Sequence, residues 1–482
     1  MITPDNFYSR LANENIFENE IFDLTDQTLV INHFKSDYVC FENCSFNCEN
    51  LNFQKIPNES LILHFKNCSF NCNVSFSDSS FKQLAFRNTK FLKSLNLGHG
   101  QSDLRLMVFQ FSNDVENPPE LICDFSIRNT NIEIFLFEKI KHIEGKFRFS
   151  KNILGERKIT TFENSTITNA LFADNSFLAF SIFRRVKFNS TVENMKSIGA
   201  AFEFPCFYKN TFAKVSFSES EFINTFQFEN CDFLSTVWFE NCKNLNHSKL
   251  KFIACEFKGF SLFNKSEIHF LDITRCTFAK SSSFTDAEFN TLKLFEVKFG
   301  GGAYFDEMKI NKVLDKSYLK DKSKILEWKR TLRAIKQELQ KTENKIDFNT
   351  YRNYELAAHY KELNYKENFK DTSILWATKW SSNFGNWTWA LCFTLIIGLV
   401  FFSSFYILEN IHRTINLHNW PDFIYGYFRF FLITDFKNEY YESGESILKF
   451  NCFFSLIPFL IGKITVFFGL YEMIQSFRKF KA

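Results

Sequence analysis

The sequence of residues 41–48 is Phe-Glu-Asn-Cys-Ser-Phe-Asn-Cys, and that of residues 65–72 is Phe-Lys-Asn-Cys-Ser-Phe-Asn-Cys. These near copies are offset by 24 residues, and residues 228–233 repeat the phrase as Phe-Glu-Asn-Cys-Asp-Phe. Around them, phenylalanine recurs every five residues over long stretches. A helix face repeats at about 3.6 residues and a strand face at 2, so this period fits neither. It predicts a solenoid in which each short side of a coil points one large side chain inward.

The expected core of the repeat consists of large aromatic residues and of small residues placed two positions before them. The chain holds 67 phenylalanines among 482 residues, far more than a usual globular protein, so aromatic rings are expected to fill the coils. The predicted core residues are Cys44, Phe46, Cys68, Phe70, Phe76, Phe81, Phe86, Phe91, Phe212, Phe217, Phe222, Cys231, Phe233, Cys255, Phe257, Cys276 and Phe278.

This pattern resembles the pentapeptide-repeat proteins, whose five-residue units carry a central Leu or Phe preceded two positions earlier by a small residue. The resemblance implies a β-solenoid, a right-handed quadrilateral β-helix in which four units close one coil, over residues 35–310. At about 20 residues per coil, we expect about 13 coils spaced by the distance between paired strands. The match is good over residues 39–93 and 205–299. It is poor over residues 98–160, where we expect bulges or an inserted loop.

A stacked solenoid leaves an open strand edge at each end, and such edges need covering. Residues 1–34 begin with an amphipathic stretch and are predicted to form an N-terminal cap. Residues 311–380 lose the five-residue period and become rich in charge, which predicts a helical linker that caps the other end.

The 13 cysteines follow the repeat rather than a disulfide pattern, and in the cytosol they should be reduced. Cys40, Cys44 and Cys48 have Cys-x3-Cys spacing, which also invites a zinc interpretation. We favour small buried side chains, with Cys44 stacked on Cys68 and Cys48 on Cys72. No metal and no cofactor is therefore predicted.

A stripe of apolar residues marks one helix within the linker. Its members are spaced by alternating steps of three and four residues, and they are Ile325, Trp328, Leu332, Ile335 and Leu339. A second helix is expected from about residue 349 to 369, after a turn at 342–345. Two interpretations remain: a helical hairpin within one chain, or a coiled-coil seam between subunits.

Residues 381–482 are predicted to form a membrane domain. Residues 387–408 are uncharged and residues 447–474 are mostly apolar, and each stretch exceeds the roughly 20 residues that a spanning helix needs. Trp387, Trp389 and Tyr406 fit the aromatic belts at membrane surfaces. The basic residues that flank the two spans, and a start without signal-peptide features, place the N-terminal body and the C-terminus in the cytoplasm.

Between the spans, the aromatic residues 422–436 are too short to cross a membrane and too apolar for an ordinary loop, which predicts a re-entrant pore helix. This end, with the junction at residues 381–385, resembles the ion-channel-like domain that follows pentapeptide repeats in some bacterial membrane proteins. The resemblance implies the inner membrane of a bacterium. No Thr-Val-Gly-Tyr-Gly filter is present, so potassium selectivity is not implied.

Lys463 is a cation in the middle of a span, where charge is costly and usually faces a bundle interior or water. It is predicted to line or gate a pore; the alternatives are snorkelling to a membrane surface and pairing with Asp435 or Glu472. The pore or gating candidates are Lys463, Arg429, Thr434, Asp435, Pro458, Gly462, Gly469 and Glu472.

No catalytic motif is found, so we do not expect an enzyme. We expect a membrane-embedded ion channel or pore-forming effector that works as a homo-oligomer, with a tetramer favoured because one hairpin cannot enclose a pore. An unknown ligand or protein would bind the β-helix. Membrane effectors of bacterial antiphage defence are similar in plan. The alternative is a membrane-anchored scaffold without conductance. DNA mimicry requires a strongly acidic rod, and the body before residue 311 is only slightly acidic.

Overall fold

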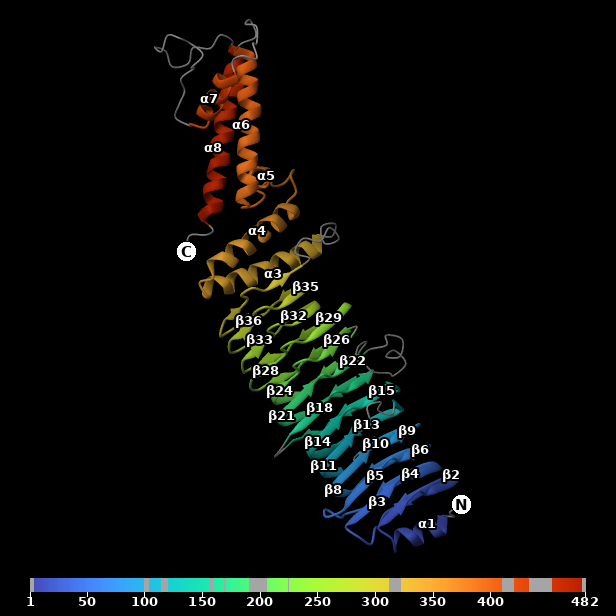
Figure 1. Ribbon diagram of the computed structural model, residues 1–482. Coiled ribbons are helices and arrows are strands. Elements are labelled where there is room, and N and C mark those ends of the chain that lie inside the picture. The colour runs from blue at the N-terminus through green and yellow to red at the C-terminus, as the bar shows by residue number, and fades with distance from the viewer. Residues whose placement is uncertain are drawn as a thin grey trace. The chain divides into compact units, whose positions relative to one another are not determined.

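A computed structural model describes residues 4–98, 104–113, 120–155, 159–168, 170–189, 206–223, 225–311, 322–409, 420–432 and 453–478. The chain divides into two compact units, Met1–Val313 and Leu314–Ala482. The first unit consists of stacked short strands and the second of helices (Figure 1). Each unit is described by itself below.

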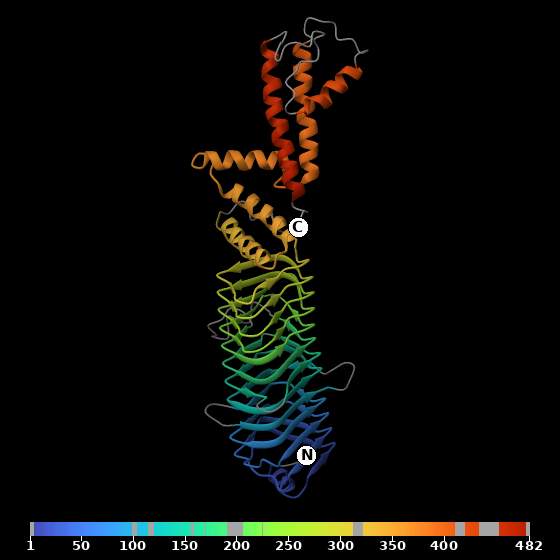
Figure 2. The same ribbon diagram turned by 90° about the vertical axis from the view of Figure 1, so that its left-hand side faces the viewer.

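The first unit is a parallel β-solenoid of about 11 turns. Its strands form two long sheets in which each strand pairs in parallel with the corresponding strand of the next coil, as Figure 2 shows in side view. One sheet contains β1 (Ile16–Glu18), β3 (Tyr38–Glu42), β5 (Ile62–Lys66), β8 (Ser80–Arg87), β11 (Leu104–Ser112), β14 (Thr130–Glu138), β17 (Ile153–Leu154), β18 (Thr160–Glu163), β21 (Ser176–Arg184), β24 (Thr211–Ser216), β27 (Asp232–Phe233), β28 (Val237–Trp238), β30 (Glu256–Phe257), β31 (Ser261–Leu262), β33 (Thr277–Phe278), β34 (Ser282–Ser283), β36 (Lys298–Phe299) and β37 (Ala303–Tyr304).

The other sheet is built from the intervening sides of the same coils. It contains β2 (Ile21–Ile31), β4 (Ser45–Gln54), β6 (Ser69–Phe70), β7 (Asn73–Ser77), β9 (Lys90–Phe91), β10 (Ser94–Leu97), β12 (Glu120–Ile122), β13 (Asp124–Arg128), β15 (Lys141–Glu144), β16 (Phe147–Ser150), β19 (Thr166–Thr168), β20 (Ala170–Ala173), β22 (Lys187–Asn189), β23 (Cys206–Tyr208), β25 (Glu221–Phe222), β26 (Thr225–Glu229), β29 (Lys243–Ile253), β32 (Glu267–Thr274), β35 (Glu288–Phe295) and β38 (Lys309–Ile310).

The coils are longer than the 20 residues expected from the repeat, which is why about 11 turns are present rather than 13. Hydrogen-bonded equivalents in neighbouring coils lie 24 residues apart at Asn43 and Asn67, and 35 apart at Asn175 and Asn210. Register shifts in β2, β21 and β29 mark places where extra residues are accommodated. Residues 98–160, where the period is weak, still contain β11 to β17 and the start of β18, with a register shift between Leu121 and Ile122.

Coil corners explain why asparagine so often precedes a small residue in the repeat. Asn43 and Asn67 have φ of 54° and 52°, a left-handed conformation that asparagine tolerates better than most residues. The small residue that follows turns inward, and the Cys68 Sγ donates to the Phe41 carbonyl oxygen of the preceding coil at 3.3 Å. Burial raises the pKa of the Cys242 thiol in the same kind of position to about 12. These cysteines therefore act as small buried donors.

Phenylalanine rings form continuous stacks along the inside of the solenoid. Rings from successive coils lie parallel, with centroids 4.7 Å apart for Phe46 and Phe70 and 4.4 Å for Phe53 and Phe76. Neighbouring stacks meet edge to face, as between Phe46 and Phe65 at 6.3 Å. All 17 residues predicted as the repeat core are buried. Burying each ring stabilises the fold by roughly 1.5–3 kcal/mol.

The helix α1 (Pro4–Leu11) covers the first coil. Its Phe7 is fully buried against Phe22, with ring centroids 5.0 Å apart. The hydroxyl of Tyr8 accepts a hydrogen bond from the backbone N–H of Val30 at 3.0 Å. The first strand already begins at Ile16, within the residues predicted as a cap.

The second unit begins with an antiparallel hairpin of α3 (Lys322–Lys341) and α4 (Lys345–Glu362). Asn344 caps α4 by accepting from the Asp347 N–H at 3.1 Å, so the turn lies where the sequence predicts it. All five residues of the predicted stripe are buried in the single chain. Burial alone would raise the pKa of Glu355, but hydrogen bonds from Lys336 and Arg333 outweigh it and lower this pKa.

The remaining helices are α5 (Phe369–Ser382), α6 (Trp387–Glu409), α7 (Trp420–Phe430) and α8 (Leu456–Arg478), the last preceded by the 3-10 turn η3 (Phe453–Ser455). The second linker helix expected at 349–369 instead ends at Glu362, and α5 is a separate helix that the sequence pattern did not indicate. The turn around Asn364 separates them, because its side chain accepts from the Lys366 N–H and donates to Glu367.

Candidate membrane-embedded site

The helices α6 and α8 are long and apolar enough to cross a membrane. Their mean hydropathies are 2.4 and 2.0, and only 22% and 33% of the corresponding segments are buried. A core helix of a water-soluble domain would be mostly buried, whereas these helices expose their apolar residues. Exposed on α6 and α8 are Leu391, Leu395, Ile396, Leu399, Val400, Ile407, Ile457, Leu460, Ile461, Ile464, Phe467 and Ile474.

Small residues allow α6 and α8 to approach closely. The buried positions of α6 include Ala390, Thr394, Gly398 and Phe402, which recur every four residues along one face. A Cβ atom added to Gly469 of α8 would lie 2.3 Å from Thr394 Oγ1, closer than real contacts allow. This is the small-residue packing that lets helices associate within lipid.

The short helix α7 runs beside α6 and ends next to its middle. At its start Phe423 contacts Tyr406, near the end of α6, with ring centroids 5.2 Å apart. One turn later the hydroxyl of Tyr427 donates to the Leu395 carbonyl oxygen at 2.8 Å. Directly after the helix, the ring of Phe431 fills the space above Gly398. The segment therefore descends from one end of the span to about half its length.

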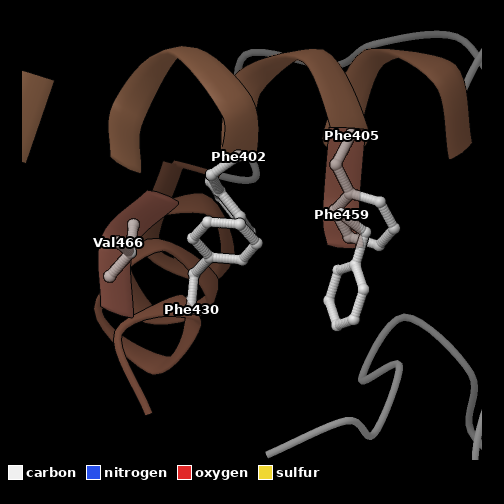
Figure 3. Packing of buried hydrophobic residues seen from close by; sticks show 5 residues of the cluster. All are labelled: Phe402, Phe405, Phe430, Phe459 and Val466. Atoms are coloured by element: carbon white, nitrogen blue, oxygen red, sulfur yellow. The ribbon is translucent and has the colours of Figure 1, made fainter. Parts of the chain in front are cut away.

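A cluster of aromatic residues fixes α7 between α6 and α8. Figure 3 shows its five buried members, which come from all three helices: Phe402, Phe405, Phe430, Phe459 and Val466. Phe430 occupies the centre, with ring centroids 5.7 Å from Phe402 and 5.8 Å from Phe459. Gly462 makes room for it, because a Cβ there would lie 2.7 Å from the Phe430 ring.

Lys463 binds the backbone two residues beyond α7, which ends at Phe430. Its side chain is 5% exposed, and its ammonium donates to the Leu432 carbonyl oxygen at 2.7 Å. The ammonium also lies 5.0 Å from the centre of the Phe430 ring and 5.5 Å from that of Phe459, within cation–π range. Helices end in unpaired carbonyl groups with partial negative charge. The Lys463 ammonium therefore lies close to this partial negative charge.

Two carboxylates mark the opposite ends of the α6–α8 pair. Glu472 of α8 accepts a hydrogen bond from the Ser382 hydroxyl at 2.9 Å, where α5 joins α6. Glu409, at the end of α6, accepts from the hydroxyl of Ser455 just before α8. Both carboxylates therefore connect segments that are distant in sequence.

The other pore or gating candidates have less defined surroundings. Pro458 lies in the first turn of α8, where its missing N–H removes no helical hydrogen bond. Arg429 is half-buried in the last turn of α7. Thr434 and Asp435 lie outside the described residues. Sequence reasoning missed Leu432, Tyr427 and Ser382, whose roles depend on backbone oxygens and on partners far along the chain.

A hollow of about 310 Å³ lies on one face of the solenoid, over β5, β8, β11 and β14. The hollow forms because the small side chain of Ala85 lies between the larger side chains of His64 and Gln110 in the neighbouring coils. Three cations, Lys66, Arg87 and Lys139, line the hollow with Glu138. The buried His64 Nε2 and Asn113 Oδ1 beside it have no hydrogen-bond partner within the described residues.

Across the described ranges, no group of three or more His, Cys, Asp or Glu side chains is arranged to hold a metal ion. No family model, no curated protein and no solved structure matches this chain.

Proposed function

We propose that the protein is an oligomeric ion channel or pore-forming effector of a bacterial inner membrane, with the pentapeptide-type β-helix as its cytoplasmic sensor or docking platform. The observation that carries this proposal is the depth of α7. A short helix that ends beside the middle of a span is sheltered by protein on the side of α6 and α8, as re-entrant segments must be.

One copy cannot enclose a pore, so a closed ring of copies is required. In such a ring, the end of α7 lies toward the axis and points its partial negative charge toward the permeating ion. Lys463 offsets that charge through its bond to Leu432. The pore therefore favours anions over cations at this depth.

The solenoid supports a sensing role through its hollow. Cations outnumber carboxylates around it, so a small anionic ligand suits it best. Ligand binding on the solenoid would favour one of two arrangements of the spans, which is the plan of a gated antiphage effector.

The decisive experiment is conductance of the purified full chain in planar bilayers. We expect the wild type to conduct, and Lys463→Met to shift the permeability ratio toward cations because it leaves the end of α7 uncompensated. Lys90→Met is the matched control, since Lys90 is an exposed cation on β9 of the solenoid. Absence of conductance in every oligomer tested would refute the channel.

A membrane-anchored scaffold is the second candidate. It is favoured by the burial of Lys463, which leaves only 5% of this residue exposed in the single chain. In a scaffold, Lys463 only holds α7 in place, and Lys463→Met leaves binding of a partner to the solenoid unchanged.

A further inference from the structure

The helix α5 presents an aromatic face that no other described part of the second unit covers. Phe369, Trp376 and Trp380 are spaced by seven and four residues, so they share one face of the helix. Their exposed fractions are 57%, 54% and 54%, and the two indole rings lie 6.4 Å apart. Large aromatic side chains this exposed in a row usually mark a binding surface.

The position of α5 is fixed relative to the two apolar helices. Asn383, Phe384 and Gly385 all have positive φ, which makes a sharp turn between α5 and α6. The Trp389 indole N–H donates to the Trp380 carbonyl oxygen at 2.9 Å, and the Ser382 hydroxyl binds Glu472 of α8. As a result, α5 lies across the ends of α6 and α8 rather than along them (Figure 2).

Those same helix ends carry further exposed aromatic residues. Trp387 and Trp389 begin α6, and Phe477 lies near the end of α8 with its ring 5.5 Å from that of Trp387. Tryptophan concentrates at the boundary between lipid headgroups and acyl chains because its ring is apolar and its N–H is polar. The aromatic face of α5 therefore continues a belt at one end of the spans.

We propose that α5 lies within this boundary of the bilayer and inserts Phe369, Trp376 and Trp380 among the lipids. The exposed Lys370 and Lys379 of the same helix suit the anionic lipids of such a surface. The inference rests on the membrane insertion of α6 and α8 in the proposed function, but it needs no conductance. It makes α5 the element that fixes the linker hairpin to the membrane surface.

The test measures tryptophan emission of the full chain in bilayers that contain brominated lipids, which quench indoles in contact with them. Trp376→Phe is expected to remove part of the tryptophan emission that brominated lipids quench. In the wild type, bromine near the headgroup is expected to quench the Trp376 emission more than bromine deep in the acyl chain. Trp328→Phe is the matched negative control, because Trp328 is 5% exposed within the hairpin. Trp387→Phe is the positive control at the start of α6. All three substitutions are conservative.

The outcomes separate this inference from the proposed function. If Trp387→Phe removes quenched emission and Trp376→Phe does not, α5 lies outside the bilayer and the inference fails alone. If neither variant changes the quenched emission, the spans are not inserted, and the proposed function fails with it. Protection of Trp376 from both brominated lipid and aqueous acrylamide would identify a protein surface, such as a second copy, and would overturn the inference.

Discussion

At the scale of single residues, buried asparagines in the middle of the solenoid are satisfied by hydrogen bonds to the neighbouring coils. Asn152 and Asn175 lie in equivalent positions of successive coils and are 1% exposed. The Asn175 Oδ1 accepts from both the backbone and side-chain nitrogens of Asn152, while its own amide donates to the Phe149 carbonyl oxygen. Such a ladder fixes the register between coils, because a shifted coil would leave several buried groups unpaired.

Asn175→Ala is expected to destabilise the solenoid by about 3 kcal/mol, since it removes four side-chain hydrogen bonds and leaves buried polar groups without partners. Urea unfolding followed by circular dichroism measures the change. Asn290→Ala is the control, because Asn290 is half-exposed on the outer face of β35. Equal effects of the two substitutions would contradict a stabilising role for the ladder.

His142 is a buried histidine, and its hydrogen bonds show which ring nitrogen carries the proton. The Thr168 N–H donates to Nδ1 at 3.4 Å, so Nε2 carries the hydrogen and donates to the Cys123 carbonyl oxygen at 3.1 Å. Burial lowers the pKa of this imidazole from 6.5 to about 4. The folded state therefore holds a neutral ring.

Stability should fall as the pH drops from about 6.5 to about 4, because the unfolded chain binds a proton there that the folded chain does not. The expected loss is about 3 kcal/mol over that window, with no further contribution below it. His142→Gln should flatten this part of the profile of urea midpoint against pH. An unchanged slope would show that other groups produce the acid sensitivity.

At the scale of elements, α6 and α8 are held together by close approaches at small residues as well as by the aromatic cluster. The contact of Gly469 with Thr394 is the tightest of these between α6 and α8. The small residues also leave space for the ring of Phe430, so that packing of the spans and placement of α7 depend on each other.

Gly469→Leu should separate α6 from α8, because the added side chain meets a β-branched residue that cannot turn away freely. The expected result is a thermal midpoint in detergent several degrees below that of the wild type. Leu470→Ala removes a half-buried neighbour and serves as a size-changing control with a smaller effect. A Gly469→Leu protein as stable as the wild type would argue against this packing.

At the scale of the whole molecule, one chain combines a solenoid whose apolar residues are inside with two helices whose apolar residues are outside. The two arrangements suit different solvents: water around the first unit and lipid around α6 and α8. We therefore expect the full chain to stay in the membrane pellet after alkaline carbonate washing. A fragment of residues 1–313 is expected in the supernatant with a strand-rich circular dichroism spectrum, and recovery of the full chain in the supernatant would contradict membrane insertion.

The sequence by itself determined the solenoid, its aromatic core and the two apolar helices, because each is encoded by a short period or by an uninterrupted apolar run. Phe46 and Phe70 could be assigned inward from their spacing alone. The coil number was overestimated, since bulges lengthen coils without changing the local five-residue unit.

Only the tertiary structure decided the partner of Lys463, the depth of α7 and the place of α5. The bond from Lys463 to Leu432 joins residues 31 apart, and that from Ser382 to Glu472 joins residues 90 apart. A backbone carbonyl is present at every residue, so no side-chain pattern singles out Leu432. Which of these groups meet depends on how three helices pack, and packing depends on shape and contact over the whole unit rather than on local periodicity.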